Sequence, residues 1–279
     1  MRGTTLTAGM GALLVSASIA SAQQHTRNIM VVGFWPPTNE LARQWSTNPA
    51  QNPGGWQGGN WENRGYDIHS FFPEFPGITQ APYGRGVGDF EVDYQDTSAD
   101  FWRVVAEIRP IAIISFSRGS SGSNWEIESR AIKYPLANWS PDYLAPTRPT
   151  TDLPIAQEPD NTIRTSSLPM TQILNAVGSS GLPLNTFIDT SNNFGGNFVS
   201  NFQAYHSSWY ADLNSEPFSP NWCIAGGHIH VGTTTPQSVA NQAAMITMRE
   251  LTSYLDTVIP APGTLAAVGV LPLLLRRRR

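Results

Sequence analysis

Three residues of the types used in nucleophilic hydrolysis are spread along this chain of 279 residues. Ser200 follows the glycine turn Gly195-Gly196, at a position where a helix is expected to begin. His230 lies further along the chain on an expected strand, and Glu128 lies in an alternating segment before both. A hydroxyl, an imidazole and a carboxylate can supply the nucleophile, the base and the group that orients the base. The sequence therefore predicts a catalytic site of Ser200, His230 and Glu128, provided that the fold brings them together.

The expected elements would place each group where it can act. At the start of a helix the backbone N–H groups are free, so they can stabilise negative charge on a carbonyl oxygen that Ser200 attacks. Asn201 and the neighbouring amides are expected beside this charge. A histidine at the carboxyl end of a strand lies at the edge where α/β sheets bind ligands. Its second ring nitrogen needs a partner, and Glu128 is the candidate.

Two other interpretations of these residues stay open. Ser200 can be an ordinary serine at a helix N-terminus, without a catalytic role. Because alternate residues of a strand share a face, His228 and His230 can also both bind zinc. The third ligand would then be Glu128, His206 or Asp189. No further cluster of cysteine and histidine supports a metal, so we expect neither a metal nor another cofactor.

The composition favours an extracytoplasmic protein that does not bind nucleic acid. The net charge is -4, and no basic stripe precedes the last four residues. Charged residues make up only 14% of the chain, and small polar residues, glycine and proline take their place, which is typical of long ordered loops. Cys223 is the only cysteine, so no disulfide can form within the chain, and we expect this thiol to be buried.

Both ends of the sequence have the character of processing signals. Residues 1–22 combine a basic residue, an apolar run and the cleavage pattern Ala20-Ser21-Ala22, as in a signal peptide for secretion. Residues 259–279 combine a Pro-Ala-Pro-Gly motif, an apolar run too short to span a bilayer alone, and four terminal arginines. This tail resembles the PEP-CTERM sorting signals of exported bacterial proteins, although Ala261 stands where a glutamate is usual. We expect an exported protein, periplasmic, at the cell surface or extracellular, with transient membrane contact through this tail.

Between these ends, residues 23–258 alternate between strand and helix patterns and predict a single domain. The alternation favours an α/β fold with a mixed, largely parallel sheet between two layers of helices, that is, a three-layer α/β/α sandwich. The Trp-rich segment 35–65 is expected to be a long loop, and its four tryptophans indicate that it is packed. Strands are expected at 28–34, 66–72, 90–94, 111–116, 126–133, 184–188 and 222–231, and helices at 99–108, 168–177, 196–210 and 236–255.

Several short motifs, in order, resemble the pyroglutamyl peptidase I (pyrrolidone-carboxylate peptidase) family. Gly33-Phe34-x-Pro36 resembles the opening G-F-x-P-F, and Glu128-x-x-Ala131 resembles the E-R-x-A segment that carries the catalytic glutamate. The segment 196–201, Gly-Asn-Phe-Val-Ser-Asn, resembles G-x-Y/F-x-C-N, with Ser200 at the catalytic cysteine. Ile229-His230-Val231 resembles the I-H-V-P segment that carries the catalytic histidine. Two turns, Ser167-Leu168-Pro169 and Gly181-Leu182-Pro183, also resemble family elements, whereas Ser129 and Gly232 depart from its arginine and proline.

The resemblance implies a phosphorylase/hydrolase-like fold and a peptidase that removes N-terminal pyroglutamyl or related small amide groups. Ser200 would attack the substrate with His230 and Glu128 as its partners, and Phe34, Phe198 and Asn201 would contact it. The family commonly forms homo-oligomers. A serine hydroxyl needs stronger assistance from a base than a thiol does. The alternative is therefore a catalytically inactive protein that binds pyroglutamyl-type termini at the cell surface.

Overall fold

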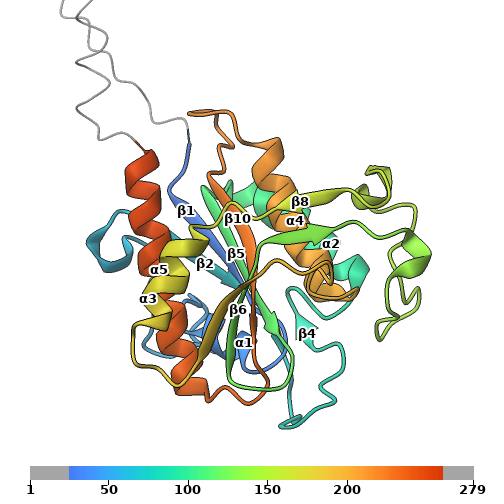
Figure 1. Ribbon diagram of the computed structural model, residues 1–279, viewed down its shortest axis with the longest axis horizontal. Helices are drawn as coiled ribbons and strands as arrows, with labels where there is room; N and C mark the ends of the chain where they lie inside the picture. Colours follow the sequence, from blue (N-terminus) through green and yellow to red (C-terminus); the bar gives the residue numbers. More distant parts are fainter. Residues whose placement is uncertain (1–24, 260–279) are drawn as a thin grey trace, which may run out of the picture.

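A mixed six-stranded sheet forms the centre of the molecule in the computed structural model, which describes residues 25–259 (Figure 1). The expected signal peptide and, from residue 260 on, the expected sorting tail lie outside the described residues. The strand order is β2-β1-β5-β10-β6-β9. Strands β1 (Asn28–Val32), β2 (Asp67–Phe71), β5 (Ala112–Arg118) and β10 (Ala225–Val231) are parallel to one another. Strand β6 (Asn124–Glu128) runs antiparallel to β10, and β9 (Asn185–Asp189) pairs parallel with β6.

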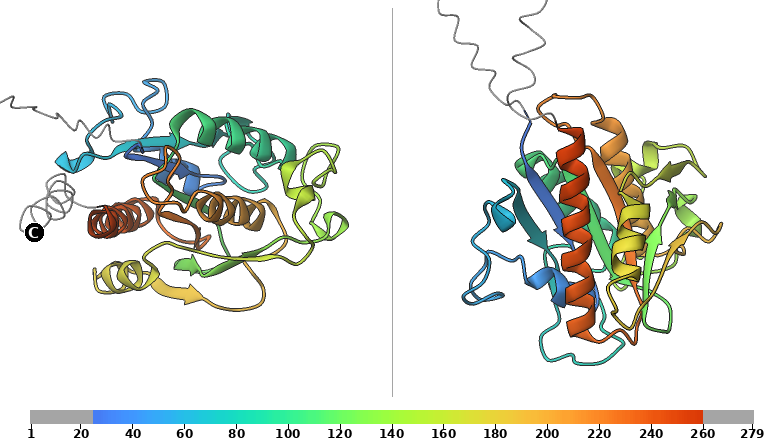
Figure 2. Two further views of the ribbon diagram at one scale, coloured as in Figure 1. Left: turned by 90° about the horizontal axis from the view of Figure 1, so that it is seen from above. Right: turned by 60° about the vertical axis from the view of Figure 1, so that its left-hand side comes forward.

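Helices cover both faces of this sheet (Figure 2). On one face lie α2 (Tyr94–Ile108) and α4 (Val199–Leu213), and on the other lie α1 (Thr38–Arg43), α3 (Met170–Gly178) and α5 (Gln237–Val258). Side chains alternate between the faces along each strand, so Ile29 packs in one core and Met30 in the other. The predicted three-layer α/β/α sandwich is thus confirmed. Among residues 25–259 we find no helix that combines the length and the apolar character needed to cross a bilayer.

One expected strand is wrong because its last residues begin a helix. The segment 90–94 was expected in the sheet, but the Asp93 carboxylate accepts hydrogen bonds from the backbone N–H groups of Gln95 and Asp96, at 2.9 and 3.0 Å. This N-cap starts α2 at Tyr94, five residues before the expected position. The alternating pattern of 90–94 therefore belongs to the entry into a helix.

The segment 126–133 forms two strands instead of one. Strand β6 ends at Glu128, and after Ser129 the chain continues as β7 (Arg130–Ile132). Strand β7 pairs with β8 (Ile163–Thr165) in a separate two-stranded sheet, and β3 (Pro73–Glu74) with β4 (Val87–Gly88) forms another. Short 3₁₀ helices lie at Trp61–Asn63, Leu136–Asn138 and Pro154–Gln157. The Trp-rich segment also contains α1, and its Trp45 and Trp61 are buried, so it is packed as expected.

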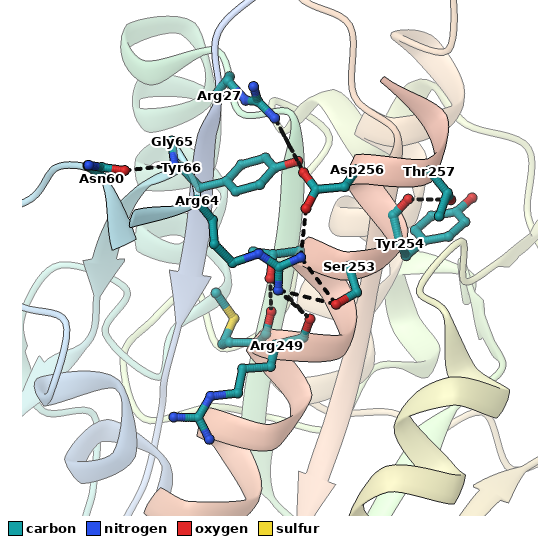
Figure 3. A network of polar contacts seen from close by, with 12 residues as sticks. Arg27, Asn60, Arg64, Gly65, Tyr66, Arg249, Ser253, Tyr254, Asp256 and Thr257 are labelled. Atoms are coloured by element: carbon teal, nitrogen blue, oxygen red, sulfur yellow. Dashed lines mark hydrogen bonds and ion pairs between the residues drawn. The ribbon is translucent and has the colours of Figure 1, made fainter. Parts of the chain in front are cut away.

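A polar network ties the beginning of β1 to the end of α5 (Figure 3). The Asp256 carboxylate on α5 accepts a hydrogen bond from the Tyr66 hydroxyl at 2.8 Å and pairs with Arg64 at 2.6 Å and with Arg27 at 3.4 Å. Burial raises the pKa of Tyr66 to about 12. The network lies at the amino ends of the parallel strands, because Arg27 and Tyr66 directly precede β1 and β2.

Candidate active site

A buried imidazole–carboxylate pair lies between the neighbouring strands β10 and β6. The His230 Nδ1 and Glu128 Oε1 atoms are 2.6 Å apart, and the two residues are 5% and 2% exposed. In the register of the strands Glu128 lies opposite His228, so the bond to His230 is diagonal. Because a carboxylate only accepts, Nδ1 carries the proton of neutral His230 and Nε2 is left with its lone pair. This is the arrangement that a general base needs.

The glycine turn before α4 passes directly over this pair. Gly195 and Gly196 both have left-handed backbone conformations, with φ of +69° and +88°. A Cβ atom on Gly195 would lie 2.8 Å from His230 Cε1 and 3.2 Å from Glu128 Oε1, whereas one on Gly196 would meet nothing within 4 Å. A side chain at Gly195 would therefore collide with the pair, and glycine lets the backbone approach it closely.

Ser200 lies in the first turn of α4, just after this glycine turn. Its Oγ donates a hydrogen bond to the Gly195 carbonyl at 3.4 Å, and no other partner is found for it among residues 25–259. Phe198 precedes the helix and makes no side-chain capping hydrogen bond to the N–H groups of the first turn. The Gly195 carbonyl thus accepts a hydrogen bond from Ser200, and the Cα of the same residue packs against the His230 ring.

A small pocket of about 30 Å³ opens beside Ser200, at the carboxyl ends of β1 and β5. Phe34 and Phe198, the two aromatic residues expected to contact substrate, both line it. Trp35 packs on Phe198 with ring centroids 5.8 Å apart, and its indole N–H donates to the Gly84 carbonyl at 2.8 Å. The remaining lining residues are Val92, Ser117, Arg118, Val199 and Ser200. The pocket is therefore lined by aromatic and aliphatic residues together with two serines and one arginine.

Asn201 lies away from this pocket, contrary to the expectation that it would contact substrate. It is fully buried, its Oδ1 accepts from the Ile132 N–H at 3.1 Å, and its Nδ2 donates to the Ile132 carbonyl at 2.8 Å. These bonds join the first turn of α4 to β7. Asn201 therefore fixes the position of the helix that carries Ser200 relative to β7.

The zinc site considered for His228 and His230 does not fit the structure. The two nitrogens of His228 lie 2.7 Å from the hydroxyls of Ser115 and Ser117, so neither is free to bind a metal. His206 is fully buried among aromatic rings, its Nδ1 lies 2.8 Å from the Phe202 carbonyl, and burial lowers its pKa to about 4. Within residues 25–259, the group of potential ligands close enough to share an ion is Glu126, Glu128 and His230, whose nearest atoms lie within 4.8 Å of one another.

Sequence reasoning missed most of the remaining residues of this site, among them Trp35, Ser117, Arg118 and Glu126. The sequence did contain a signal for Glu126, because Glu126 and Glu128 are two residues apart on one strand and so lie on the same face of the sheet. Burial raises the pKa of the Glu126 carboxyl, with His230 opposing this shift and Glu128 adding to it. Ser117 and Arg118 end a buried parallel strand, which is where an α/β sheet places ligand-binding residues.

The fold is similar to that of solved pyrrolidone carboxyl peptidases. The enzyme from Thermococcus litoralis has a TM-score of 0.56 and 16% sequence identity, over 84% of this chain and 99% of that chain. The enzyme from Pyrococcus furiosus, solved together with its cysteine-free mutant, has a TM-score of 0.57 and 17% identity, over 82% and 99% of the two chains. No protein-family model and no curated protein matches the sequence. At these identities the comparisons establish that this chain shares the fold of the pyrrolidone carboxyl peptidases.

Proposed function

We propose that this chain is a hydrolase that removes N-terminal pyroglutamyl or related small amide groups, with Ser200 as its nucleophile. The observation that carries the proposal is the buried 2.6 Å contact between His230 and Glu128 beneath the glycine turn that leads to Ser200. The shared fold with pyrrolidone carboxyl peptidases supports the class of reaction.

In the proposed reaction Ser200 Oγ attacks the scissile carbonyl carbon and transfers its proton to His230 Nε2. Glu128 holds Nδ1–H and balances the charge of the imidazolium that forms. The N–H groups at the start of α4 stabilise the oxyanion, and Phe34 and Phe198 pack on the small acyl group. The C–N bond then breaks and the amine leaves with the proton from His230. Water gives a proton to His230 and attacks the acyl carbon, and Ser200 Oγ leaves with that proton as the C–O bond of the acyl-serine breaks.

A second candidate function, binding without turnover, is favoured by one observation. The Ser200 hydroxyl donates to the Gly195 carbonyl at 3.4 Å, and it has no hydrogen bond to His230 among the described residues. Catalysis requires this hydroxyl to turn toward Nε2 when substrate binds. A protein in which the Ser200 hydroxyl does not rotate toward Nε2 would keep the pocket and bind pyroglutamyl termini without cleaving them.

Release of coumarin from L-pyroglutamyl-7-amido-4-methylcoumarin distinguishes the two functions. The unmodified protein is compared with Ser200→Ala and Ser200→Cys, and binding is measured in parallel by calorimetry. Turnover that is lost in Ser200→Ala supports the serine hydrolase. Binding without turnover, with turnover appearing only in Ser200→Cys, supports the binding protein. Neither binding nor turnover in any variant would refute both functions.

We also propose that the protein is exported and sorted through its two ends. The support is the sequence alone, the signal-like residues 1–22 and the PEP-CTERM-like tail 259–279. Cell fractionation of a strain that makes the full chain, followed by mass measurement of the mature protein, tests whether both segments are removed. Light scattering of the same material measures the expected homo-oligomer. A full-length chain recovered from the cytoplasm would contradict export.

A further inference from the structure

A second histidine, His228, forms a buried polar chain beside the proposed catalytic pair. Ser115 and Ser117 on β5 face His228 and His230 across the pairing with β10. The Ser115 hydroxyl lies 2.7 Å from His228 Nδ1, and the Ser117 hydroxyl lies 2.7 Å from His228 Nε2. Ser115 is fully buried, and His228 and Ser117 are almost so, at 1% and 4% exposure. The chain Ser115–His228–Ser117 ends at the pocket, because Ser117 is one of its lining residues.

The direction of the hydrogen bonds in this chain follows from the inner serine. A serine hydroxyl has a single proton, and Ser115 Oγ lies 2.7 Å from His228 Nδ1, 3.2 Å from the Gly227 carbonyl oxygen and 3.5 Å from the Ser207 hydroxyl. We assign the proton to the Gly227 carbonyl, because that oxygen can only accept whereas His228 Nδ1 can donate. Ser115 must then accept from His228, which places the imidazole proton on Nδ1. Burial, together with the nearby His230, lowers the pKa of His228 well below its usual value, so the ring is neutral and Nε2 has no proton. Ser117 must therefore donate its own proton to Nε2.

This arrangement fixes what Ser117 can offer to a ligand. Its proton is committed to His228, so its oxygen presents lone pairs only. We propose that Ser117 is a specificity-determining residue that accepts a hydrogen bond from a ring N–H of the substrate and so selects lactams over rings that lack this donor. The assignment rests on the proposed function, since it names the substrate class of the same pocket.

Two amide probes that differ in one ring atom test the assignment. One carries the pyroglutamyl lactam, and in the other the ring N–H is replaced by oxygen, as in 5-oxotetrahydrofuran-2-carboxamide. Binding is measured by calorimetry in Ser200→Ala, which prevents turnover. The lactam is expected to bind about 10- to 100-fold more tightly, because the lactone leaves the Ser117 oxygen unpaired and faces it with another lone pair. Adding Ser117→Ala should reduce the preference to within about threefold, whereas Ser117→Thr, which keeps the hydroxyl, should preserve most of it.

The possible failures of the two proposals are distinguishable. Lactam and lactone probes that bind equally well to protein with intact Ser117 would overturn the role of Ser117 and leave the proposed function standing. Absence of binding for both probes would overturn the proposed function and this inference together.

A measurement that needs neither ligand nor turnover tests the hydrogen-bond direction itself. Nitrogen-15 NMR of histidine-labelled protein, with His228→Asn to identify the signals, reports which nitrogen carries the proton. A neutral Nδ1–H form supports the assignment. A neutral Nε2–H form would overturn it, because Ser117 would then receive a proton from His228 and keep its own for the ligand.

Discussion

A methyl group added at Gly195 should disable the proposed site without unfolding the domain. Alanine at this position would have its Cβ 2.8 Å from His230 Cε1 and 3.2 Å from Glu128 Oε1. To reach the 3.4 Å of an ordinary contact, the imidazole or the loop must move by about 0.6 Å. Such a shift lengthens or bends the 2.6 Å contact between His230 and Glu128. Misplacement of catalytic groups by about 1 Å can cost roughly 100-fold in rate.

Gly196 provides the matched control for this substitution. Both glycines have left-handed backbone conformations, so alanine at either position should cost about 1–2 kcal/mol of stability from backbone strain. Only at Gly195 does the added methyl meet the pair, since nothing lies within 4 Å of a Cβ at Gly196. We therefore expect similar losses of stability in the two variants and an additional loss in kcat/KM of about 30- to 100-fold in Gly195→Ala alone.

The assay combines urea unfolding with hydrolysis of the pyroglutamyl-coumarin probe. Where turnover is absent, the NMR signal of the His230 Nδ1 proton serves as the readout in place of hydrolysis, because that proton is hydrogen-bonded to Glu128. We expect the signal to shift or disappear in Gly195→Ala and to be unchanged in Gly196→Ala. Equal activity, or equal proton signals, in two folded variants would refute the claim that the turn is packed against the pair.

Three further substitutions test other parts of the structure. Glu128→Gln keeps the shape of the side chain but removes the charge that orients His230 and stabilises its imidazolium, so kcat/KM should fall about 10³- to 10⁴-fold with little change in melting temperature; an unchanged rate would contradict its role. Asn201→Ala breaks both bonds to Ile132 and should lower the free energy of unfolding by about 2–4 kcal/mol in urea titrations, whereas a loss confined to substrate affinity would place it at the pocket after all. Burial lowers the pKa of His206 from 6.5 to about 4, so between these values the unfolded chain binds a proton that the folded chain does not. The free energy of unfolding should therefore fall by roughly 3 kcal/mol as the pH drops from about 6.5 to 4, and His228 acts in the same direction. In His206→Phe, a plot of the free energy of unfolding against pH should fall less steeply over this range. An unchanged slope would mean that His206 titrates normally in the folded protein.

The sheet and its covering helices were predictable because they have a strong periodic signal. The segment 111–116, which includes most of strand β5, is a nearly continuous apolar run, which is typical of a central parallel strand buried on both faces. The turn before Ser200 was predictable for a local reason, since consecutive glycines supply the left-handed conformations that it adopts. The residues gathered at one edge of the sheet followed from the rule that α/β folds bind ligands at the carboxyl ends of strands.

What the sequence did not predict depends on contacts between distant segments. The Asp93 cap competes with a strand pattern at 90–94, and it prevails because it satisfies two N–H groups of α2. Asn201 follows Ser200 directly, but only the position of β7 shows that its amide binds Ile132. The roles of His228 and Ser117 depend in the same way on the pairing of β10 with β5, strands more than a hundred residues apart.

The ion pair between Arg27 and Asp256 has a consequence for how this domain can be attached to a surface. Its two residues lie near the two ends of the described chain and 3.4 Å apart, so these ends lie side by side, at the amino ends of the parallel strands (Figure 3). The pocket lies at the carboxyl ends of β1 and β5, that is, at the opposite ends of the strands. A tether joined to either end would therefore hold the pocket facing away from the support. Because the ends are close, a short linker could also join them, and new chain ends could be made in another loop to give a circular permutant.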